Sequence, residues 1–423
     1  MLQLNYIREN KEDVIRRLKK KHFPAETVIP QIIEKDADRR KIQAELDSIK
    51  AEANTYARQI GEMMKAGKKA EAEDAKNKSV ALKESEKSLQ DKLNATEEEL
   101  QQLLVQVPNL PNEIVPEGKV AADNKNVFQH GEIPKLFEGA QPHWELAAKY
   151  DIIDFELGVK LTGAGFPVYK GKGAKLQRAL INFFLDRATA AGYLEVQPPI
   201  MVNKDSGFGT GQLPDKEGQM YHVTFDDLYL IPTAEVPITN IYRDVILKAE
   251  DLPIKNCGYT PCFRREAGSY GKDVRGLNRL HQFDKVEIVQ IAHPSKSYET
   301  LEEMRQFVAG LLKDLELPFR TLLLCGGDMS FASAQTYDME VFSAAQEKWL
   351  EVSSVSNFES FQSNRLKLRY REGSEKPVLA HTLNGSALAL PRIVAALLEN
   401  NQEPDGIRIP QVLRAYTGFD KIN

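Results

Sequence analysis

The sequence predicts an α+β fold in which an antiparallel β-sheet with helices follows a long helical hairpin. Residues 36–107 contain no proline and are rich in Ala, Glu, Lys, Leu and Gln, which is typical of long helices. Prolines cluster just beyond, at Pro108, Pro111 and Pro116, where they end the helix and form a stiff connector. After them, helical patterns and short β-branched runs follow one another without the regular βαβ order of a Rossmann domain.

Length, charge and cysteine content bound the class of protein. A chain of 423 residues exceeds the usual size of one core, so we expect two domains, residues 1–110 and 111–423. The net charge of −5 argues against a surface generally coated by nucleic acid or membrane, although a local basic patch could bind RNA. Three cysteines without metal-ligand spacing are typical of reduced cytosolic thiols. No apolar run suits a signal peptide or a membrane span, so we expect a cytoplasmic protein without a membrane partner.

Two heptad seams predict the helical hairpin. The first seam consists of Ile42, Leu46, Ile49, Ala53, Tyr56, Ile60 and Met63. The second consists of Ala75, Ser79, Leu82, Leu89, Leu93, Leu100, Leu103 and Val107. Because residues 65–69 break the pattern, we expect two antiparallel helices of roughly 35 residues, each about 50 Å long, that project as an arm.

Two functions fit such an arm. Heptads most often join subunits in a dimerising coiled coil. The alternative is contact with RNA, because basic residues in the distal half could neutralise phosphates and read helix shape. These basic residues are Lys50, Arg58, Lys65, Lys68, Lys69, Lys76 and Lys78. The patch is only mildly basic because acidic residues interleave with them, namely Glu52, Glu62, Glu71, Glu73 and Asp74.

Beyond the prolines, the pattern predicts one helix and several strands. Residues 175–190 have an apolar helical face, and YLEVQPPIMV (193–202) reads as a strand that Pro198 and Pro199 restrict to an edge or an end. Further strands are predicted at 228–231, 285–290 and 339–341, and the turns between them favour antiparallel pairing. GAGFPVYKGKGAK (163–175) matches neither the dinucleotide nor the Walker pattern, so we expect a mobile turn there.

The stretch FRREAGSYGKDVRGLNRLHQFDKVEIV (263–289) reads as a β-hairpin with a Gly-rich excursion. On a strand, Arg264 and Glu266 would share a face, and Phe283, Lys285 and Glu287 would share one on the returning strand. Together they offer a cation for a phosphate, a ring for a base, and carboxylates for amino groups. This set indicates a nucleotide beside an amine. However, ion pairs on exposed strands are common, and Phe283 could instead belong to the core.

The hairpin resembles motif 2 of the class II aminoacyl-tRNA synthetases. LNGSALALPRIVAALLEN (383–400) resembles motif 3, and the helix and strand ending in QPPIMV resemble motif 1, which lies at the dimer interface in that class. The whole chain resembles the bacterial type of the seryl-tRNA synthetase family, in VPNLP, PTAEVP, FRREAGSYG, HQFDKVE, EVSSVSNFESFQ, NGSALALPR and IPQVLRAYTGFD. The resemblance implies a homodimer with an N-terminal tRNA-binding domain and a class II catalytic domain.

The resemblance also implies a reaction and its site. L-Serine is activated with ATP to seryl-adenylate and then transferred to the 3′ end of tRNA(Ser), and of tRNA(Sec) where the cell has one. The implied catalytic residues are Arg264, Arg392 and Glu351. The implied ATP contacts are Arg264 (α-phosphate), Arg265, Glu266 (adenine amino group), Phe283 (adenine ring), Arg392 (other ring face and γ-phosphate), Arg279 and Arg275 (outgoing phosphates), Glu351, Val352, Ser353 and Ser354. The implied serine contacts are Thr233, Ala234, Glu235, Arg264, Glu287, Asn384 and Ser386.

Magnesium and tRNA are the remaining implied ligands. Glu351 and Ser354 would hold Mg²⁺, which suits an all-oxygen site shared with substrate phosphates. The implied tRNA contacts are Lys50, Arg58, Lys65, Lys68, Lys69 and Lys76. Because this transfer needs alignment and cationic stabilisation more than a protein nucleophile, we expect no general base.

The sequence departs slightly from the family pattern at Arg265, where Ser is frequent, and at Val355, where Cys is frequent. Both positions lie beside the implied site residues, and neither departure puts those residues in doubt. Two alternatives stay open. One is a class II paralogue that activates another small amino acid or loads a carrier protein, and the other is a non-catalytic RNA-binding paralogue.

Overall fold

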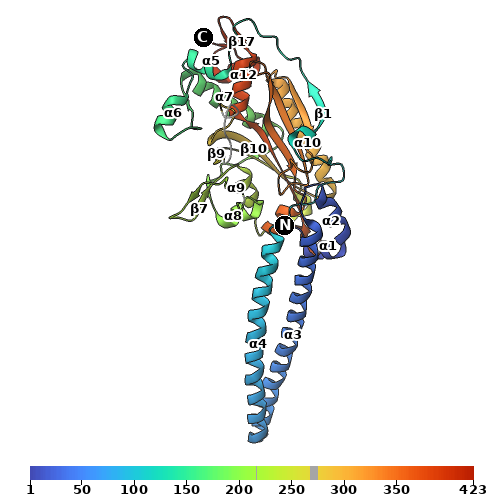
Figure 1. Cartoon of the computed structure of the whole chain (residues 1–423). Coiled ribbons are helices and arrows are strands. Elements are labelled where there is room, and N and C mark those ends of the chain that lie inside the picture. Colours follow the sequence, from blue (N-terminus) through green and yellow to red (C-terminus); the bar gives the residue numbers. More distant parts are fainter. Residues whose placement is uncertain (216, 267–274) are drawn as a thin grey trace. The chain divides into compact units, whose positions relative to one another are not determined.

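The computed structural model describes residues 1–215, 217–266 and 275–423 (Figure 1). The chain divides into two compact units. One comprises residues 2–19 and 23–108, and the other comprises residues 1, 20–22 and 109–423. The predicted boundary after residue 110 therefore lies close to Pro108, the last residue of the first unit. In these ranges, no helix has the length and apolar character that crossing a membrane requires.

The first unit is a helical hairpin with two short helices. It contains α1 (Leu4–Glu9), α2 (Lys11–Lys19), α3 (Ala25–Lys65) and α4 (Lys69–Leu104). The predicted antiparallel hairpin is confirmed, since α3 and α4 run side by side and α3, with 41 residues, is about 62 Å long (Figure 1). α3 begins at Ala25 rather than near Asp36. Pro30 lies in its second turn, where it removes one backbone hydrogen bond without ending the helix.

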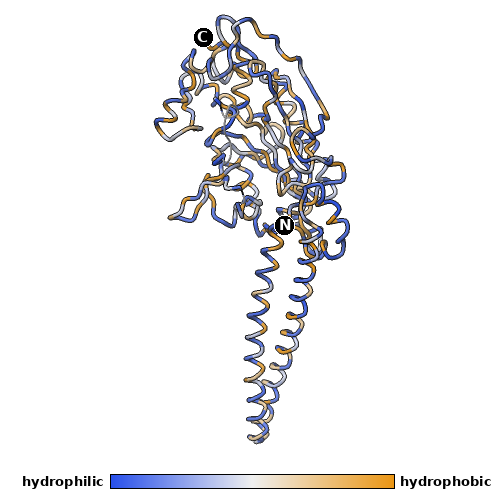
Figure 2. Tube along the Cα trace, in the orientation of Figure 1, coloured by the Kyte–Doolittle hydropathy of each residue, from blue (hydrophilic) through white to orange (hydrophobic). Residues whose placement is uncertain are grey.

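The two predicted seams lie on the inner faces of this hairpin. Every seam residue is buried or half-buried, whereas most charged residues between them are exposed. Leu46, Leu93 and Leu100 are 1%, 4% and 3% exposed. Figure 2 shows apolar residues recurring at intervals along both helices. The apolar faces are therefore occupied within one chain.

A buried carboxylate fixes the base of the hairpin. Asp36 is 2% exposed and accepts hydrogen bonds from Arg8 (3.1 Å), Arg39 (3.0 Å) and Arg40 (3.1 Å). Burial alone disfavours its charged form, but the hydrogen bonds from Arg39 and Arg8 outweigh this, so the pKa of Asp36 is lowered. Removing this carboxylate would take a shared partner away from three arginines.

The second unit is built on an eight-stranded sheet in the order β1-β11-β12-β13-β16-β10-β9-β4. The strands are β1 (Lys125–His130), β4 (Leu194–Glu195), β9 (Ile254–Phe263), β10 (Gln282–Ala292), β11 (Phe319–Leu323), β12 (Gln335–Ser343), β13 (Lys348–Asn357) and β16 (His381–Ala389). Neighbouring strands are antiparallel except β4, which runs parallel to β9 at one edge. The antiparallel sheet predicted from the sequence is confirmed.

Helices cover one face of this sheet. α7 (Gly171–Ala190), α10 (Ser297–Asp314) and α12 (Leu390–Asn400) share one apolar core with the strands. Along β10, Val286 and Ile288 point into this core, whereas Val289 packs on the opposite face against α9 (Glu235–Asn240). Because side chains alternate along a strand, Glu287 shares the face of Val289. The sheet thus presents one face to the core and the other to the α9 side.

Short elements complete the second unit. They are α5 (His143–Lys149), α6 (Phe155–Leu161), α8 (Lys204–Thr210), α11 (Phe361–Leu366) and α13 (Gln411–Thr417), with 3-10 turns at Ala121–Asp123, Ala249–Asp251 and Pro294–Lys296. Four small sheets contain β2 (Ile153–Asp154), β3 (Val168–Tyr169), β5 (Met201–Asn203), β6 (His222–Val223), β7 (Leu228–Leu230), β8 (Ile246–Lys248), β14 (Arg369–Arg371), β15 (Val378–Leu379), β17 (Gln402–Glu403), β18 (Gly406–Arg408) and β19 (Lys421–Ile422). The three cysteines are buried and unpaired.

Strands were predicted at 228–231, 285–290 and 339–341, and all three are present as β7, within β10 and within β12. The single strand predicted at 193–202 is wrong. Its start pairs with β9 as β4, and its end pairs with β7 as β5 in a separate sheet. Pro198 and Pro199 lie between the two halves and lack the N–H groups that a continuous ladder needs.

The predicted mobile turn at 163–175 also needs correction. It contains β3 and the first turn of α7, which begins at Gly171 rather than Lys175. A Cβ atom on Gly173 would lie 2.2 Å from the carbonyl oxygen of Ile152. Glycine is therefore needed here because the helix approaches the backbone just before β2 closely, and this need involves no phosphate.

Candidate functional site

A buried ion pair lies on the polar face of β10, beside the Thr-Ala-Glu segment at 233–235. Lys285 Nζ is 2.6 Å from Glu287 Oε2, and both side chains are less than a tenth exposed. Thr233 Oγ1 donates to Glu287 Oε2 at 2.8 Å and accepts from Lys285 Nζ at 2.9 Å. The shared face predicted for Lys285 and Glu287 is confirmed.

Glu235 adds a second buried carboxylate to this group. Burial, and after it the nearby charge of Glu287, raises its pKa to about 7, although the hydrogen bond from Gln362 acts in the opposite direction. Gln362, on α11, donates to Glu235 Oε1 at 2.6 Å and is itself held by Thr382 Oγ1 at 2.7 Å. Two buried carboxylates opposed by one lysine leave a site that a cationic ligand group would stabilise. Sequence reasoning missed Gln362, whose only signal was its place in EVSSVSNFESFQ.

The next strand brings Ser386 and Asn384 to the same region. Glu287 pairs with Ser386 and Val289 with Asn384 in the β10–β16 ladder. The side chain of Ala234 is fully buried against Ile238 and Val289, so only its backbone could meet a ligand.

Arg264 and Phe283 form a pair at the mouth of the hairpin. The Arg264 guanidinium carbon lies 5.3 Å from the centroid of the Phe283 ring, and its Nε donates to the carbonyl of Pro232 at 3.4 Å. Phe283 is half-buried and packs on the core with part of its ring. Phe283 therefore contacts the core, as one of its two interpretations expected. The Arg264 guanidinium lies over its ring.

The expectation that Arg264 and Glu266 share a strand face is wrong. β9 ends at Phe263, and although the Arg264 N–H still donates to His281, the N–H of Arg265 donates to Gln219 instead, at 2.9 Å. Glu266 has a φ of +47° and accepts from Arg279 Nη1 at 3.2 Å. The Gly-rich excursion of the predicted hairpin, residues 267–274, lies outside the described residues.

A β-bulge brings Glu351 and Ser354 to one face of β13. Glu340 pairs with Glu351 and Met339 with Ser353, which leaves Val352 as the extra residue on β13. Asp338 and Glu340 are two apart on β12 and share a face, so their partners Ser354 and Glu351 share it as well. Without the bulge, residues three apart would point to opposite faces. The side chains of Val352 and Ser353 are buried, 1% and 2% exposed.

Arg392, near the start of α12, lies beside Glu351. Its Nη1 donates to the Glu351 carbonyl at 2.6 Å and is 3.7 Å from the carboxylate. Its Nε donates to the carbonyl of Asn278 at 3.1 Å. Ser354 Oγ donates to Asp338 Oδ1 at 2.5 Å, and burial followed by the charge of Glu351 raises the pKa of Asp338. Sequence reasoning missed Asn278 and Asp338, since neither lies in a stretch whose spacing suggests a ligand.

The oxygen atoms of Glu351 and Ser354 suit a hard cation such as Mg²⁺. Across residues 1–215, 217–266 and 275–423, no group of three or more His, Cys, Asp or Glu side chains is placed to hold a metal ion. A two-ligand protein site completed by water and substrate phosphates is the arrangement that Mg²⁺ commonly uses. The residues present therefore fit the ion.

The candidate tRNA contacts lie on the hairpin, in the other unit. Arg58, Lys65, Lys68, Lys69 and Lys76 are exposed and Lys50 is half-buried. Lys68 pairs with Glu71 at 3.1 Å and Lys76 with Glu73 at 3.8 Å, both on exposed surface where such pairs are weak.

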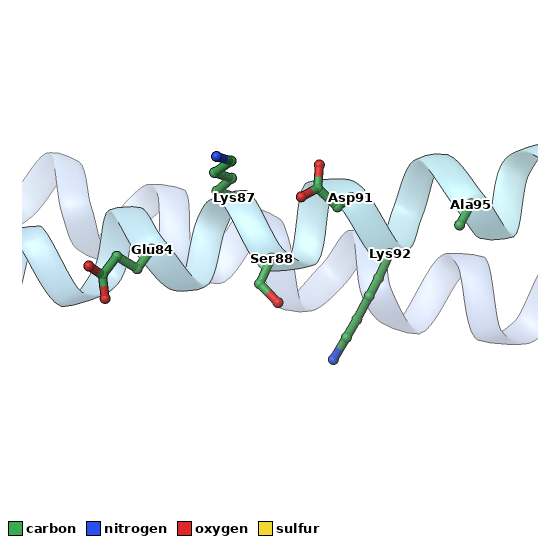
Figure 3. Close-up of a pocket in the computed structure, with 6 residues that line it drawn as sticks. All are labelled: Glu84, Lys87, Ser88, Asp91, Lys92 and Ala95. Atoms are coloured by element: carbon green, nitrogen blue, oxygen red, sulfur yellow. The ribbon is translucent and has the colours of Figure 1, made fainter.

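One hollow lies on α4, with a volume of about 550 Å³. Figure 3 shows its lining, which comes entirely from that helix: Glu84, Lys87, Ser88, Asp91, Lys92 and Ala95. Because one helix cannot enclose a small molecule, we assign no substrate to it.

Two family models match this chain. Residues 1–111 match the seryl-tRNA synthetase N-terminal domain, and residues 221–401 match the tRNA synthetase class II core domain (G, H, P, S and T). The second match contains most of the candidate site residues, from the Thr-Ala-Glu segment to Arg392.

Relatives and solved structures agree with these matches. A serine–tRNA ligase of Salinibacter ruber is 50% identical over 100% of this chain and 99% of its own length. The seryl-tRNA synthetase of Pyrococcus horikoshii complexed with ATP has a TM-score of 0.93 at 34% identity, covering 100% of this chain and 99% of that one. The cytoplasmic serine–tRNA ligase of Naegleria fowleri in complex with AMP has a TM-score of 0.88 at 26% identity, with the same coverage.

Proposed function

The chain belongs to the seryl-tRNA synthetase family, and from this membership we propose how its site works. The protein is a serine–tRNA ligase, which activates L-serine with ATP to seryl-adenylate and pyrophosphate and then esterifies tRNA(Ser). Among the structural observations, the buried pair of Glu235 and Glu287 beside Arg264 carries the most weight. That arrangement can hold an amine and a phosphate at neighbouring positions.

The serine ammonium group binds beside Glu235 and Glu287. A cation there compensates two carboxylates that Lys285 and Arg264 only partly neutralise. The serine hydroxyl bonds to the polar groups of Thr233 and Ser386, so alanine would leave those groups unpaired. Threonine is excluded mainly by volume.

ATP binds along the hairpin and β13. Adenine stacks on Phe283, with Glu266 accepting from its amino group, while Arg264 turns from the ring toward the α-phosphate. Arg392 and Arg279 neutralise the outgoing phosphates, because both lie beside carboxylates that the phosphates can replace as partners. Glu351 and Ser354 hold Mg²⁺, which supplies charge neutralisation for the phosphates.

The chain's own residues act by alignment. Arg264 holds the α-phosphate while the serine carboxylate attacks the phosphorus and pyrophosphate leaves on the opposite side. The developing charge lies near guanidinium groups that are already oriented by backbone carbonyls, those of Pro232 and Asn278. No side chain needs to remove a proton in this step, since the carboxylate is already ionised.

Partners beyond ATP and serine follow from the same family. Residues 1–110 bind tRNA, and residues 111–423 catalyse the reaction in the cytoplasm, with tRNA(Sec) as a second substrate where it exists. The protein acts as a homodimer. Leu194, Met201 and Ile241 are 66%, 46% and 50% exposed around Pro198 and Pro199, and we assign this apolar surface to contact with a second copy.

Pyrophosphate exchange tests this function. Incubation with ATP, labelled pyrophosphate and one amino acid at a time should give exchange with serine and far less with threonine, glycine or alanine. Exchange with another amino acid would indicate a paralogue of different specificity. Absence of exchange with all four would indicate a non-catalytic RNA-binding protein.

Phe283→Ala should weaken ATP binding by about 1–3 kcal/mol, the range for stacking of a base on an aromatic ring. Serine affinity should change far less, because Phe283 lies outside the Thr233–Glu287 group. Equilibrium titration with ATP measures the change. Phe283→Tyr, which keeps the ring, serves as the control, and unchanged ATP affinity in a folded Phe283→Ala protein would assign this residue to the core alone.

Serine affinity should depend on pH through Glu235. Its pKa is raised to about 7, so the free protein gains a proton here as pH falls below 7, whereas the bound ammonium favours the ionised form. The dissociation constant for serine should therefore rise about tenfold per pH unit from pH 7 to 5. Calorimetric titrations across this range measure it. Glu235→Gln should bind weakly with a flat profile, and an equally steep profile in that variant would contradict the assignment.

A further inference from the structure

Helix α5 carries a fully buried histidine that joins two parts of the catalytic unit. His143 is 0% exposed, and its Nδ1 lies 2.7 Å from Glu399 Oε1, near the end of α12. Its Nε2 accepts from the backbone N–H of Leu277 at 2.8 Å. Because Nε2 accepts, the ring hydrogen is on Nδ1 and is donated to Glu399.

Glu399 is the centre of a buried hydrogen-bond network. It also accepts from the backbone N–H of His143 at 3.0 Å, from Gln346 Nε2 at 2.9 Å, and from the hydroxyl of Ser343. Burial alone would raise the pKa of Glu399, but the hydrogen bonds from His143 and Ser343 outweigh this and lower it. Because both oxygens of this carboxylate and both ring nitrogens of His143 are hydrogen-bonded, these side chains are held in one arrangement.

Gly276 shows how closely the chain rests on this histidine. It has a φ of +66°, and a Cβ atom there would lie 2.2 Å from His143 Nε2. Both the left-handed conformation and the lack of space require glycine. The backbone of residues 275–280, which leads to β10, therefore packs directly against the imidazole of His143.

The same network reaches Arg392, which the proposed function places on the outgoing phosphates, and its neighbourhood includes Arg275, for which the family resemblance implies a phosphate contact. Asn278 Nδ2 donates to Gln346 Oε1 at 2.9 Å, and its carbonyl accepts from Arg392 Nε. Trp144, next to His143, lies under the guanidinium of Arg275 at 4.8 Å. A change at His143 would therefore also displace Asn278, which bonds Arg392, and Trp144, which contacts Arg275.

We propose that α5 is a positioning element for the phosphate-binding arginines, in which His143 and Glu399 fix the backbone at Leu277 and Trp144 fixes Arg275 before ATP binds. His143 and Glu399 cannot touch ATP, because both are fully buried. They act through the segment 275–280, which supplies Arg275 and Arg279 and supports Arg392 through Asn278. This role rests on the proposed ATP-dependent function and adds residues that contact no substrate.

Two substitutions at His143 separate positioning from packing. In His143→Asn the amide can replace Nδ1 and still donate to Glu399, but nothing accepts from Leu277. In His143→Gln the longer amide can supply the acceptor at the place of Nε2. In serine-dependent pyrophosphate exchange, we expect His143→Asn to raise the KM for ATP about tenfold and to lower kcat, with the KM for serine within twofold. His143→Gln should recover most of the loss.

Hydrogen exchange gives a readout that needs no catalysis. The amide of Leu277 should exchange slowly in the protein without ATP, rapidly in His143→Asn, and slowly again in His143→Gln. Peptides from the α10 helix serve as an internal control and should not change. Fast exchange at Leu277 in the unmodified protein, or kinetic constants in His143→Asn equal to those of the unmodified enzyme, would overturn the proposal.

Trp144 provides a second test if the His143 variants do not fold, because its side chain is only half-buried. Trp144→Ala should raise the KM for ATP several-fold, and Trp144→Phe should recover it. Equal ATP parameters in Trp144→Ala and the unmodified enzyme would overturn the positioning role. If the unmodified enzyme showed no serine-dependent pyrophosphate exchange, the proposed function would fail. The rate of hydrogen exchange at the Leu277 amide would still report whether α5 fixes this segment.

Discussion

Glu351→Gln is expected to lower the rate of seryl-adenylate formation by about 100-fold or more, because one ligand charge is removed from the proposed magnesium site. The side chain is half exposed and its charged partner Arg392 also bonds the backbone carbonyl, which the substitution leaves unchanged. The fold should therefore persist. Serine-dependent pyrophosphate exchange at several magnesium concentrations measures the loss, and more magnesium should be needed for the half-maximal rate.

Glu340→Gln is the matched control for this prediction. Glu340 pairs with Glu351 across the two strands, but its carboxylate is held by Arg320 Nε at 2.6 Å. We expect a change of only a few-fold in this variant. Near-normal exchange in Glu351→Gln would show that Glu351 has no part in the mechanism. Equal losses in both variants would indicate that carboxylates of both strands, β12 and β13, contribute to the metal site.

The sequence predicted those parts of the fold that follow from local periodicity. The seams from Ile42 to Val107 predict a hairpin because each apolar side chain needs a partner at a fixed spacing, and the short break at residues 65–69 lets the second seam of the same chain supply it. The alternation in β10 likewise placed Lys285 and Glu287 on one face. Where the backbone departs from regular geometry, the predictions from the sequence were wrong. Pro198 and Pro199 divide a strand, and the turn at Arg265 follows from a bond to Gln219, far from it in the sequence.

In the site as well, some features follow from the local sequence and others depend on tertiary contacts. Glu351 and Ser354 could be named by resemblance, but their common face depends on a bulge at Val352 that pairing with β12 creates. Gln362 lies in a stretch that resembles the family, but neither its spacing nor that of Asn278 indicates a role, since their roles come from partners such as Glu235 and Arg392 that are far away in the chain. Tertiary contacts of this kind cannot be read from spacing.

Removing the distal half of the helical hairpin should abolish efficient tRNA charging while leaving serine activation intact. The helices are joined across the hairpin by Lys35 and Glu99, 2.5 Å apart, so residues 47 and 87 lie at corresponding levels of α3 and α4. Deleting residues 48–86 and joining 47 to 87 by a short Gly-Ser linker keeps that pair, Leu46 and the buried Asp36 cluster. All six candidate tRNA contacts are removed with the deleted segment.

The truncated protein should catalyse serine-dependent exchange at the normal rate and should keep the proposed dimer, because the seams are already paired within one chain and are not available to join subunits. Its kcat/KM for tRNA(Ser) should fall about 100-fold or more, since the binding of RNA phosphates supplies much of the affinity. Aminoacylation and sedimentation measure the two outcomes. Dissociation into monomers would instead identify the hairpin as a dimerising coiled coil.

Charge reversal in the full-length chain tests whether tRNA recognition by the hairpin is electrostatic. Changing Lys68, Lys69 and Lys76 to Glu should weaken tRNA binding and reduce the slope of log affinity against log salt by about 0.9 for each phosphate that the protein no longer neutralises. Lys83, Lys87 and Lys92 are equally exposed on α4 but nearer its C-terminal end, and their reversal makes the same charge change away from the tip. An effect confined to the first triple variant would place the RNA at the tip of the hairpin. Equal effects in both would indicate attraction by overall charge, and unchanged binding in both would exclude the hairpin lysines from tRNA recognition.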